Sequence, residues 1–130
     1  MKEFMFLIRK QEGHGQTEKG EQKEFLEACR LYISKLKKEG RLIAAQPLER
    51  QGKLLSGNRN QWKDVPFNES KEVIAGYYHI RAIDIDEAME IAKDNPEFEY
   101  SETARIEIRP IKVKEESTGF VYPECETMKI

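Results

Sequence analysis

The stretch DVPFNESKEVIAGYY (residues 64–78) carries the side chains best suited to chemistry in this chain. It sets the carboxylates of Asp64 and Glu69 near the ammonium group of Lys71. A carboxylate beside an ammonium group can hold a polar substrate or act in general acid–base catalysis. The same residues also suit a plain turn, in which Asp64 bonds backbone amides and Lys71 pairs with Glu69 or Glu72 at the surface. The sequence leaves both interpretations open.

His79 is the second candidate for a general acid or base, and it lies inside the apolar run that follows this stretch. Because side chains alternate across a strand, we expect His79 to share a face with Tyr77 and Arg81. Glu107 of a later strand is expected to project the same way. A polar cluster of this kind inside a dimer would form a pocket. The structural alternative is a histidine that hydrogen-bonds Glu107 at an interface.

A cleft for a small polar ligand is predicted where an earlier strand ends, at Gln46 and Pro47. If the loop of residues 64–71 lies against that strand end, the lining side chains are Gln46, Trp62, Asp64 and Lys71. Trp62 stands alone among hydrophilic neighbours. Its ring suits either stacking on a substrate or packing on a hairpin, and the sequence does not separate these roles.

The histidines and cysteines indicate neither a metal site nor a disulfide framework. His14 lies in a glycine-rich loop as an expected surface residue, and the 2 histidines show no metal-ligand spacing. Cys29 lies on the apolar face of a predicted helix, which favours a core role over a nucleophile. Together with Cys125 it makes only 2 cysteines, too few for a disulfide scaffold. We therefore expect no metal and no cofactor.

Composition favours a small soluble domain over a nucleic-acid-binding or membrane protein. A chain of 130 residues fits one domain. Its 22 basic and 24 acidic residues give a net charge of −2, and no Lys/Arg cluster suits nucleic acid. No apolar run approaches the roughly 18 residues of a membrane span. The opening residues lack the pattern of a secretory signal, so we expect a reduced, cytoplasmic protein.

Hydrophobic periodicity predicts alternating strands and helices around these candidate residues. Strands are expected at residues 4–9, 42–48, 73–82 and 103–111, and a short extra strand returns from a turn at Gln51-Gly52 as a hairpin. Helices are expected at residues 21–38, ended by Gly40, and from Asp84 to Asn95, ended by Pro96. The order β-α-β-β-β-α-β predicts an α+β fold, a ferredoxin-like plait whose helices cover one face of a mainly antiparallel sheet.

The second face of that sheet also carries apolar side chains, including Met5, Leu7 and Tyr77. Leaving three such side chains in water forgoes roughly 5–9 kcal/mol, whereas a whole domain has a net stability of about 5–15 kcal/mol. We therefore expect the second face to be covered. A second copy of the sheet in a two-fold homodimer is one cover. The alternative cover is the C-terminal tail, through Phe120 and Tyr122.

Residues 64–96, DVPFNESKEVIAGYYHIRAIDIDEAMEIAKDNP, resemble the core of the YCII-related, or DGPF-domain, family. The family pattern is D-G-P-F-x-E-x-K-E-x-x-x-G-Y-Y, followed by a strand and D-x-D-E-A. KKEGRLIAAQPL (37–48) and IEIRPI (106–111) are similar to its second and last strand blocks. The resemblance covers residues 1–112 and leaves 113–130 as a C-terminal extension. It implies a dimeric α/β barrel, and some relatives accompany alternative sigma factors.

The chain departs from the family pattern at two places. Val65 replaces the glycine of D-G-P-F, so the backbone before Pro66 must be extended. Some relatives carry a His–Asp pair at the positions of Cys29 and Lys38, and that activity is not carried over. We expect a homodimer that binds a small polar molecule near the 64–71 loop, without nucleic acid or membrane. The alternatives are an enzyme using Asp64 or His79 as acid–base and a protein-interaction module linked to transcription.

Overall fold

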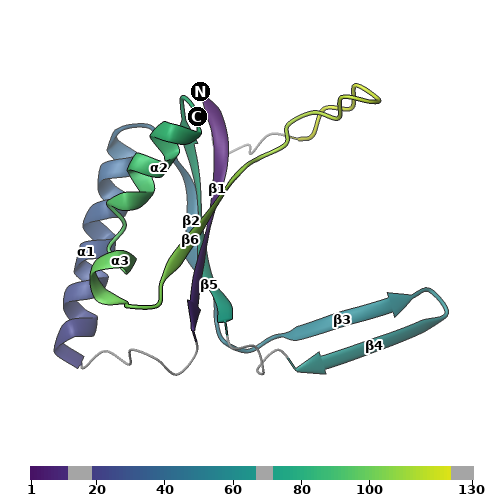
Figure 1. Cartoon of the computed structure of the whole chain (residues 1–130), viewed down its shortest axis with the longest axis horizontal. Helices are drawn as coiled ribbons and strands as arrows, with labels where there is room; N and C mark the ends of the chain where they lie inside the picture. The colour runs from purple at the N-terminus through teal and green to yellow at the C-terminus, as the bar shows by residue number, and fades with distance from the viewer. Residues whose placement is uncertain (12–18, 67–71, 124–130) are drawn as a thin grey trace.

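The computed structural model describes residues 1–11, 19–66 and 72–123 (Figure 1). Its strands are β1 (Lys2–Gln11), β2 (Leu42–Pro47), β3 (Lys53–Asn58), β4 (Gln61–Pro66), β5 (Glu72–Ala82) and β6 (Arg105–Pro110). Its helices are α1 (Lys19–Lys38), α2 (Ile85–Lys93) and α3 (Glu97–Tyr100). Four residues that the sequence singled out lie outside the described residues: His14, Glu69, Lys71 and Cys125.

Four strands form an antiparallel sheet in the order β2-β5-β1-β6. The helices α1, α2 and α3 lie on one face of this sheet (Figure 1). The predicted α+β class with an antiparallel sheet is therefore confirmed. We call the face that carries the helices the helical face and the opposite one the second face. Within the residues that the structure describes, no helix is long and apolar enough to cross a membrane.

Local sequence signals set the ends of the two longer helices, where the sequence predicts them. Gly40 has a φ of 72°, which glycine adopts without strain, and Arg41 N–H then donates to Leu36 O at 2.9 Å. At the start of α2, Asp84 Oδ1 accepts a hydrogen bond from the Glu87 N–H at 2.9 Å. These caps position α1 and α2 over the sheet.

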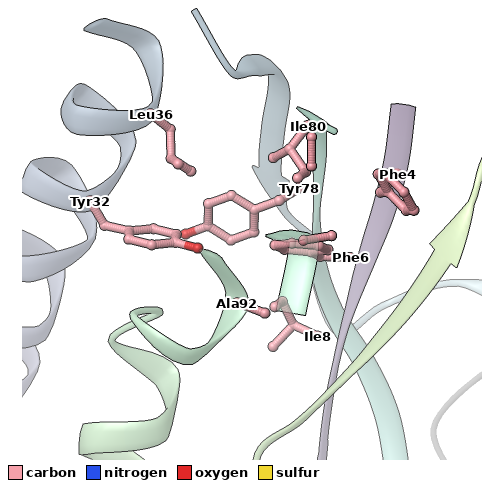
Figure 2. Packing of buried hydrophobic residues seen from close by; sticks show 10 residues of the cluster. Phe4, Phe6, Ile8, Tyr32, Leu36, Tyr78, Ile80 and Ala92 are labelled. Carbon is pink, nitrogen blue, oxygen red and sulfur yellow. The ribbon is translucent and has the colours of Figure 1, made fainter. Parts of the chain in front are cut away.

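The hydrophobic core lies between the helices and the helical face (Figure 2). Its buried members are Phe4, Phe6, Ile8, Tyr32, Leu36, Tyr78, Ile80, Ala82, Ala88 and Ala92. Tyr32 of α1 and Tyr78 of β5 meet edge to face, with ring centroids 5.5 Å apart and their hydroxyl ends close together (Figure 2). The strand predicted at residues 4–9 is confirmed, and its residues Phe4, Phe6 and Ile8 are all buried.

The prediction of a hairpin turn at Gln51-Gly52 was wrong. The hairpin is formed by β3 and β4, so its turn lies further along the chain. Residues 48–52 connect β2 to β3, and β3 pairs with β4 around a turn at Arg59 and Asn60. Every residue of β3 is exposed. Residues 61–64 of β4 are exposed as well. A strand segment without a buried face shows no alternation of apolar and polar residues, so these residues left no periodic signal. The short helix α3 was also not predicted.

Two segments project from the sheet on the side away from the helices (Figure 1). The first is β3–β4, here called the hairpin arm, and the second is residues 111–123, here called the C-terminal arm. In the C-terminal arm Phe120 and Tyr122 pack edge to face, with ring centroids 5.2 Å apart. Phe120 remains 56% exposed. These two rings therefore pack on each other, and the C-terminal arm leads away from the second face.

Candidate functional site

A cavity of about 350 Å³ opens between α1 and the helical face, where β2 ends and β5 begins. Helix α1 contributes Phe25, Leu26, Cys29 and Ile33, and the strands contribute Ile8, Lys10, Ala45, Gln46, Pro47, Ala75, Gly76, Tyr77 and Tyr78. Glu97, the first residue of α3, completes the lining. The wall is mostly apolar and holds a few polar groups, which is the composition of a small-molecule site.

Gly76 shapes the sheet beside this pocket. A Cβ atom at this position would lie 2.9 Å from Gln46 O and 3.0 Å from Pro47 Cα, both of which belong to the backbone of β2. Real Cβ atoms do not approach backbone atoms so closely, so β2 would have to move. The glycine that matches the family pattern therefore lets the end of β2 approach β5 closely and form one side of the pocket.

The charged groups of the pocket are Lys10 and Glu97. Lys10 Nζ lies 2.8 Å from Glu97 Oε2, and it also lies 5.2 Å from the centroid of the Phe25 ring. Glu97 is only 6% exposed. Its Oε2 accepts no hydrogen bond of good geometry from the described residues, so charge attraction to Lys10 is its main compensation. The pocket thus contains a buried carboxylate held by one flexible cation.

Cys29 lines the same pocket as a neutral thiol. Burial, and to a lesser extent the nearby Glu97 carboxylate, raise the pKa of Cys29 to about 11 against the opposing effect of Lys10. A thiol is a nucleophile only when it ionises. The expectation that Cys29 is a packing residue rather than a nucleophile therefore agrees with its surroundings, although it is only half-buried.

Tyr32, Tyr78 and Asn95 form the polar part of the core next to the pocket. Burial is the main cause that raises the pKa values of both tyrosines, and the Asn95 side chain partly opposes it. The Tyr32 hydroxyl donates to Ile91 O at 2.7 Å. Asn95 is 2% exposed, and its Oδ1 accepts a hydrogen bond from the Glu97 N–H at 2.9 Å. Asn95 thus fixes the backbone that presents Glu97 to the pocket.

The end of the pocket near Phe25 is acidic. The Phe25 and Tyr100 rings meet edge to face, with centroids 5.5 Å apart. Desolvation raises the pKa of Tyr100, and the carboxylates of Glu99, Glu24 and Glu21 add to that rise. Those three carboxylates therefore lie close enough to Tyr100 to act on it through their charge. Tyr100 therefore lies among acidic side chains and beside Phe25 of the pocket lining.

The structure separates the residues of the predicted cleft. Gln46 lines the pocket. Trp62 and Asp64 lie in the hairpin arm, exposed to solvent and facing Gly57 and Leu55 across the strand pair, and the pocket lining does not include them. Lys71 lies outside the described residues.

Asp64 belongs to a regular strand, because β4 extends to Pro66. Val65 is therefore extended, as the sequence predicts for the residue before a proline, and no described residue other than glycine has a positive φ. The departure from the family pattern at Val65 is thus accommodated without backbone strain.

His79 lies on the second face, apart from the pocket lining. Its Nε2 is 2.7 Å from Glu3 Oε1, and both side chains are partly buried. The expected partner, Glu107, instead accepts a hydrogen bond from Arg9 Nη1 at 2.8 Å. The prediction of a Glu107 partner was wrong because His79 pairs with Met5 across the strands, which makes Glu3, two residues before Met5, its diagonal neighbour on the same face.

Sequence reasoning missed Lys10 and Glu97, although a signal for Lys10 exists. In the sequence, the two-residue spacing of Phe4, Phe6 and Ile8 continues to Lys10, which is half-buried. A charged residue on the buried side of a strand requires a charged or polar partner. Glu97 follows Pro96 in a segment without periodicity, so the sequence does not indicate which acid is that partner. Among the described ranges, no group of three or more His, Cys, Asp or Glu side chains gathers in a way that would hold a metal ion.

The chain matches a protein-family model. The model of a family described as "YCII-related domain" matches residues 2–112, which include the sheet, the helices and all the pocket residues. No curated protein matches the chain.

Proposed function

The chain belongs to the YCII-related domain family, and from this premise we propose that it is a homodimeric protein that binds a small molecule in the pocket beneath α1. The observation that carries this proposal is the lining of that pocket. Apolar side chains form its walls, and the Lys10–Glu97 ion pair supplies a charged anchor. Ligand sites in proteins combine these two features, because apolar walls give affinity and few polar groups fix orientation.

The second face supports the dimer. Met5, Leu7 and Tyr77 lie at its centre, half-buried within a single chain. Partly buried pairs, His79–Glu3 and Arg9–Glu107, flank them. An apolar centre with a polar rim is the usual anatomy of a protein interface. The hairpin arm and the C-terminal arm project on this side (Figure 1), where they would contact a second copy.

The strand order β2-β5-β1-β6 with helices on one face suits a ferredoxin-like plait that carries the hairpin arm as an insertion. In the proposed dimer, two such sheets pack through their second faces and form an α/β barrel. Each pocket then opens on the outer, helical face of its sheet, and Tyr77 belongs both to the pocket lining and to the second face. Light scattering that reports a monomer at micromolar concentration would refute the dimer.

Ligand binding is tested by thermal shift with a library of small molecules. Cys29→Phe fills the pocket and should abolish any stabilisation that the wild-type chain shows. Leu31→Phe is a matched control, because Leu31 belongs to the same helix, is 55% exposed and is absent from the pocket lining. Hits that survive Cys29→Phe bind elsewhere. If every hit survives, the pocket is not the binding site.

A second candidate function is general acid–base catalysis by His79. The contact between His79 Nε2 and Glu3 Oε1 is an imidazole–carboxylate pair, which orients the ring. Asp64, exposed on the hairpin arm, is the other proposed acid–base group. With a thermal-shift hit as substrate, His79→Gln or Asp64→Asn would abolish turnover if the named residue acts in catalysis. Unchanged turnover in both variants would exclude this mechanism.

A further inference from the structure

We propose that the pocket ligand is an organic ammonium compound, a primary amine on a compact apolar body, whose cation takes the place that the Lys10 ammonium group occupies. This inference rests on the proposed function, since it assigns a ligand class to the same pocket. It is carried by the surroundings of Glu97, by the position of Lys10 and by the charge at the pocket entrance.

Glu97 is the anchor for a cation. Its side chain is 8% exposed, so its carboxylate has lost most of its water. Its Oε2 lacks a hydrogen bond of good geometry among the described residues. A buried carboxylate with incomplete compensation gains the most from a cation that also donates hydrogen bonds. A primary ammonium group brings both the charge and three N–H donors.

Lys10 marks where that cation sits. Its Nζ lies 2.8 Å from Glu97 Oε2 and 5.2 Å from the centroid of the Phe25 ring. A carboxylate together with an aromatic face is a recurrent recognition site for ammonium groups. The Lys10 side chain is 31% exposed and its stem is long and flexible, so it can withdraw toward solvent. Lys10 therefore competes with the ligand cation for the Glu97 carboxylate. Because it is part of the chain, we call it the tethered competitor.

The charge near the entrance favours a cation over an anion. Glu21, Glu24 and Glu99 act on Tyr100, whose ring contacts Phe25 of the pocket lining. Lys23 lies on the opposite side of α1 from Phe25 by helical periodicity, so it does not offset these carboxylates at the entrance. An anionic ligand that approached Lys10 would meet this acidic group and the Glu97 carboxylate, which both repel it.

The dimensions of the pocket set the size of the ligand. A volume of about 350 Å³ is at the lower end of the range for ligand pockets. Phe25, Leu26 and Ile33 of α1 face Ile8 and Ala45 of the sheet across this space, and such walls suit a single ring or a short branched chain. Benzylamine and 2-phenylethylamine match these requirements and serve as probes.

The experiment is calorimetric titration of the full chain with three probes of similar size: 2-phenylethylamine, 2-phenylethanol and phenylacetate. We expect the amine to bind and the alcohol and carboxylate to bind at least about tenfold more weakly, because only the amine forms the charge-assisted contact with Glu97. Glu97→Gln should weaken amine binding by at least about tenfold for the same reason. Phenylacetate as the preferred probe would overturn the inference.

Lys10→Met is expected to change the affinity for the amine in the opposite direction from Glu97→Gln. Removing the tethered competitor should tighten amine binding by at least about fivefold, since the ligand cation then meets a nearly buried Glu97 carboxylate that no lysine neutralises. Lys93→Met is the matched control, because Lys93 pairs with Glu90 on α2 and does not line the pocket. If Glu97→Gln fails to fold, the sign of the Lys10→Met effect still decides, and weaker amine binding in Lys10→Met would overturn the inference.

The outcomes also separate this inference from the proposed function. Library hits that are lost in Cys29→Phe but include no amine refute the ammonium ligand and leave the pocket as a binding site. Library hits that all survive Cys29→Phe refute both. Amine binding that is lost in Cys29→Phe and in Glu97→Gln and tightened in Lys10→Met supports both.

Discussion

Lys10 Nζ and Glu97 Oε2 meet 2.8 Å apart, although Lys10 lies near the end of β1 and Glu97 begins α3. The contact joins the sheet to the segment that follows α2, and it places a cation on a carboxylate that is nearly excluded from water. Because Glu97 is so little exposed, losing one member of the pair has a different effect on stability from losing the other. Loss of the lysine strands a buried charge, whereas loss of the glutamate leaves a lysine that can reach solvent.

Removing Lys10 alone should therefore destabilise the ligand-free protein. For Lys10→Ala we expect the free energy of unfolding to fall by about 1–3 kcal/mol, the cost of leaving a buried polar group without its partner. The double variant Lys10→Ala/Glu97→Gln should recover part of this loss, because the stranded charge is gone. Urea denaturation followed by circular dichroism measures both values.

The control for this prediction is Lys93→Ala. Lys93 pairs with Glu90 on the surface, with side-chain exposures of 64% and 71%, so its loss should change stability by no more than about 0.5 kcal/mol. Equal effects of Lys10→Ala and Lys93→Ala would show that the Lys10–Glu97 contact is an ordinary surface pair.

The reactivity of Cys29 should report the charges around it. With a pKa of about 11, only about one thiol in a thousand is ionised at about pH 8, so alkylation by iodoacetamide should be slow and should accelerate with rising pH. Glu97 raises this pKa and Lys10 lowers it. Glu97→Gln should therefore speed alkylation, and Lys10→Met should slow it.

This measurement uses a Cys125→Ser background, so that Cys29 is the reacting thiol. Mass spectrometry at a series of pH values gives the rate. A ligand in the pocket should protect Cys29, since this side chain belongs to the lining. Rapid alkylation near neutral pH would contradict the raised pKa and return Cys29 to consideration as a nucleophile.

The same pKa shift predicts a loss of stability at high pH. The pKa of the thiol is 9.0 when it is unperturbed, as in the unfolded chain, and about 11 in the folded chain. Below about pH 9 both states are protonated and Cys29 contributes no pH dependence. Between these two values the unfolded thiol ionises first, so the folded state loses stability as pH rises. Cys29→Ser should flatten this part of the curve, and an unchanged slope would contradict the shift.

Much of the fold could be predicted from the sequence because its elements bury one face. Phe4, Phe6 and Ile8 alternate in β1, and Asp84 and Gly40 give helix signals that act locally. The hairpin arm could not be placed in this way. Its β3 strand is exposed throughout, and Leu54, Leu55 and Trp62 show no period that burial would impose.

The site was harder to predict than the fold, because its residues come together only through tertiary packing. Gln46 was expected in a cleft and does line the pocket. Lys10 and Glu97 are far apart in the sequence, and neither lies in a motif. The segment DVPFNESKEVIAGYY drew attention through its charges, but its Gly76, Tyr77 and Tyr78 contribute the pocket lining. Small and aromatic residues that shape a sheet can thus also line a pocket.

Gly76 should tolerate no side chain. In Gly76→Ala the new Cβ would meet Gln46 O at 2.9 Å and Pro47 Cα at 3.0 Å, and displacement of β2 should cost about 1–3 kcal/mol of stability. Thermal denaturation measures this cost. Gly119→Ala separates steric contact from backbone strain, because a Cβ there has no neighbour within 4 Å and its cost comes only from the positive φ of 76°. A Gly76→Ala variant as stable as wild type would show that β2 shifts freely at this edge of the pocket.

The dimer should depend on the second face. Leu7 lies opposite Glu107 and Tyr77 in the register of the sheet, so Leu7→Glu places a new carboxylate beside an existing one at the centre of the proposed interface. We expect sedimentation to report a monomer for this variant. Met89→Glu, on an exposed part of α2, should remain dimeric. A dimeric Leu7→Glu protein with native circular dichroism would move the interface elsewhere.

The hairpin arm carries its own reporter, because Trp62 is the only tryptophan of the chain. Within one chain the Trp62 side chain is 60% exposed, so its emission should resemble that of tryptophan in water. If the arm packs on a second copy, the indole ring loses water and its emission shifts to shorter wavelength. We therefore expect the wild-type dimer to emit at shorter wavelength than the Leu7→Glu monomer, and Met89→Glu to match the wild type. Identical spectra for a dimeric wild type and a monomeric variant would show that the hairpin arm does not contact the partner through Trp62.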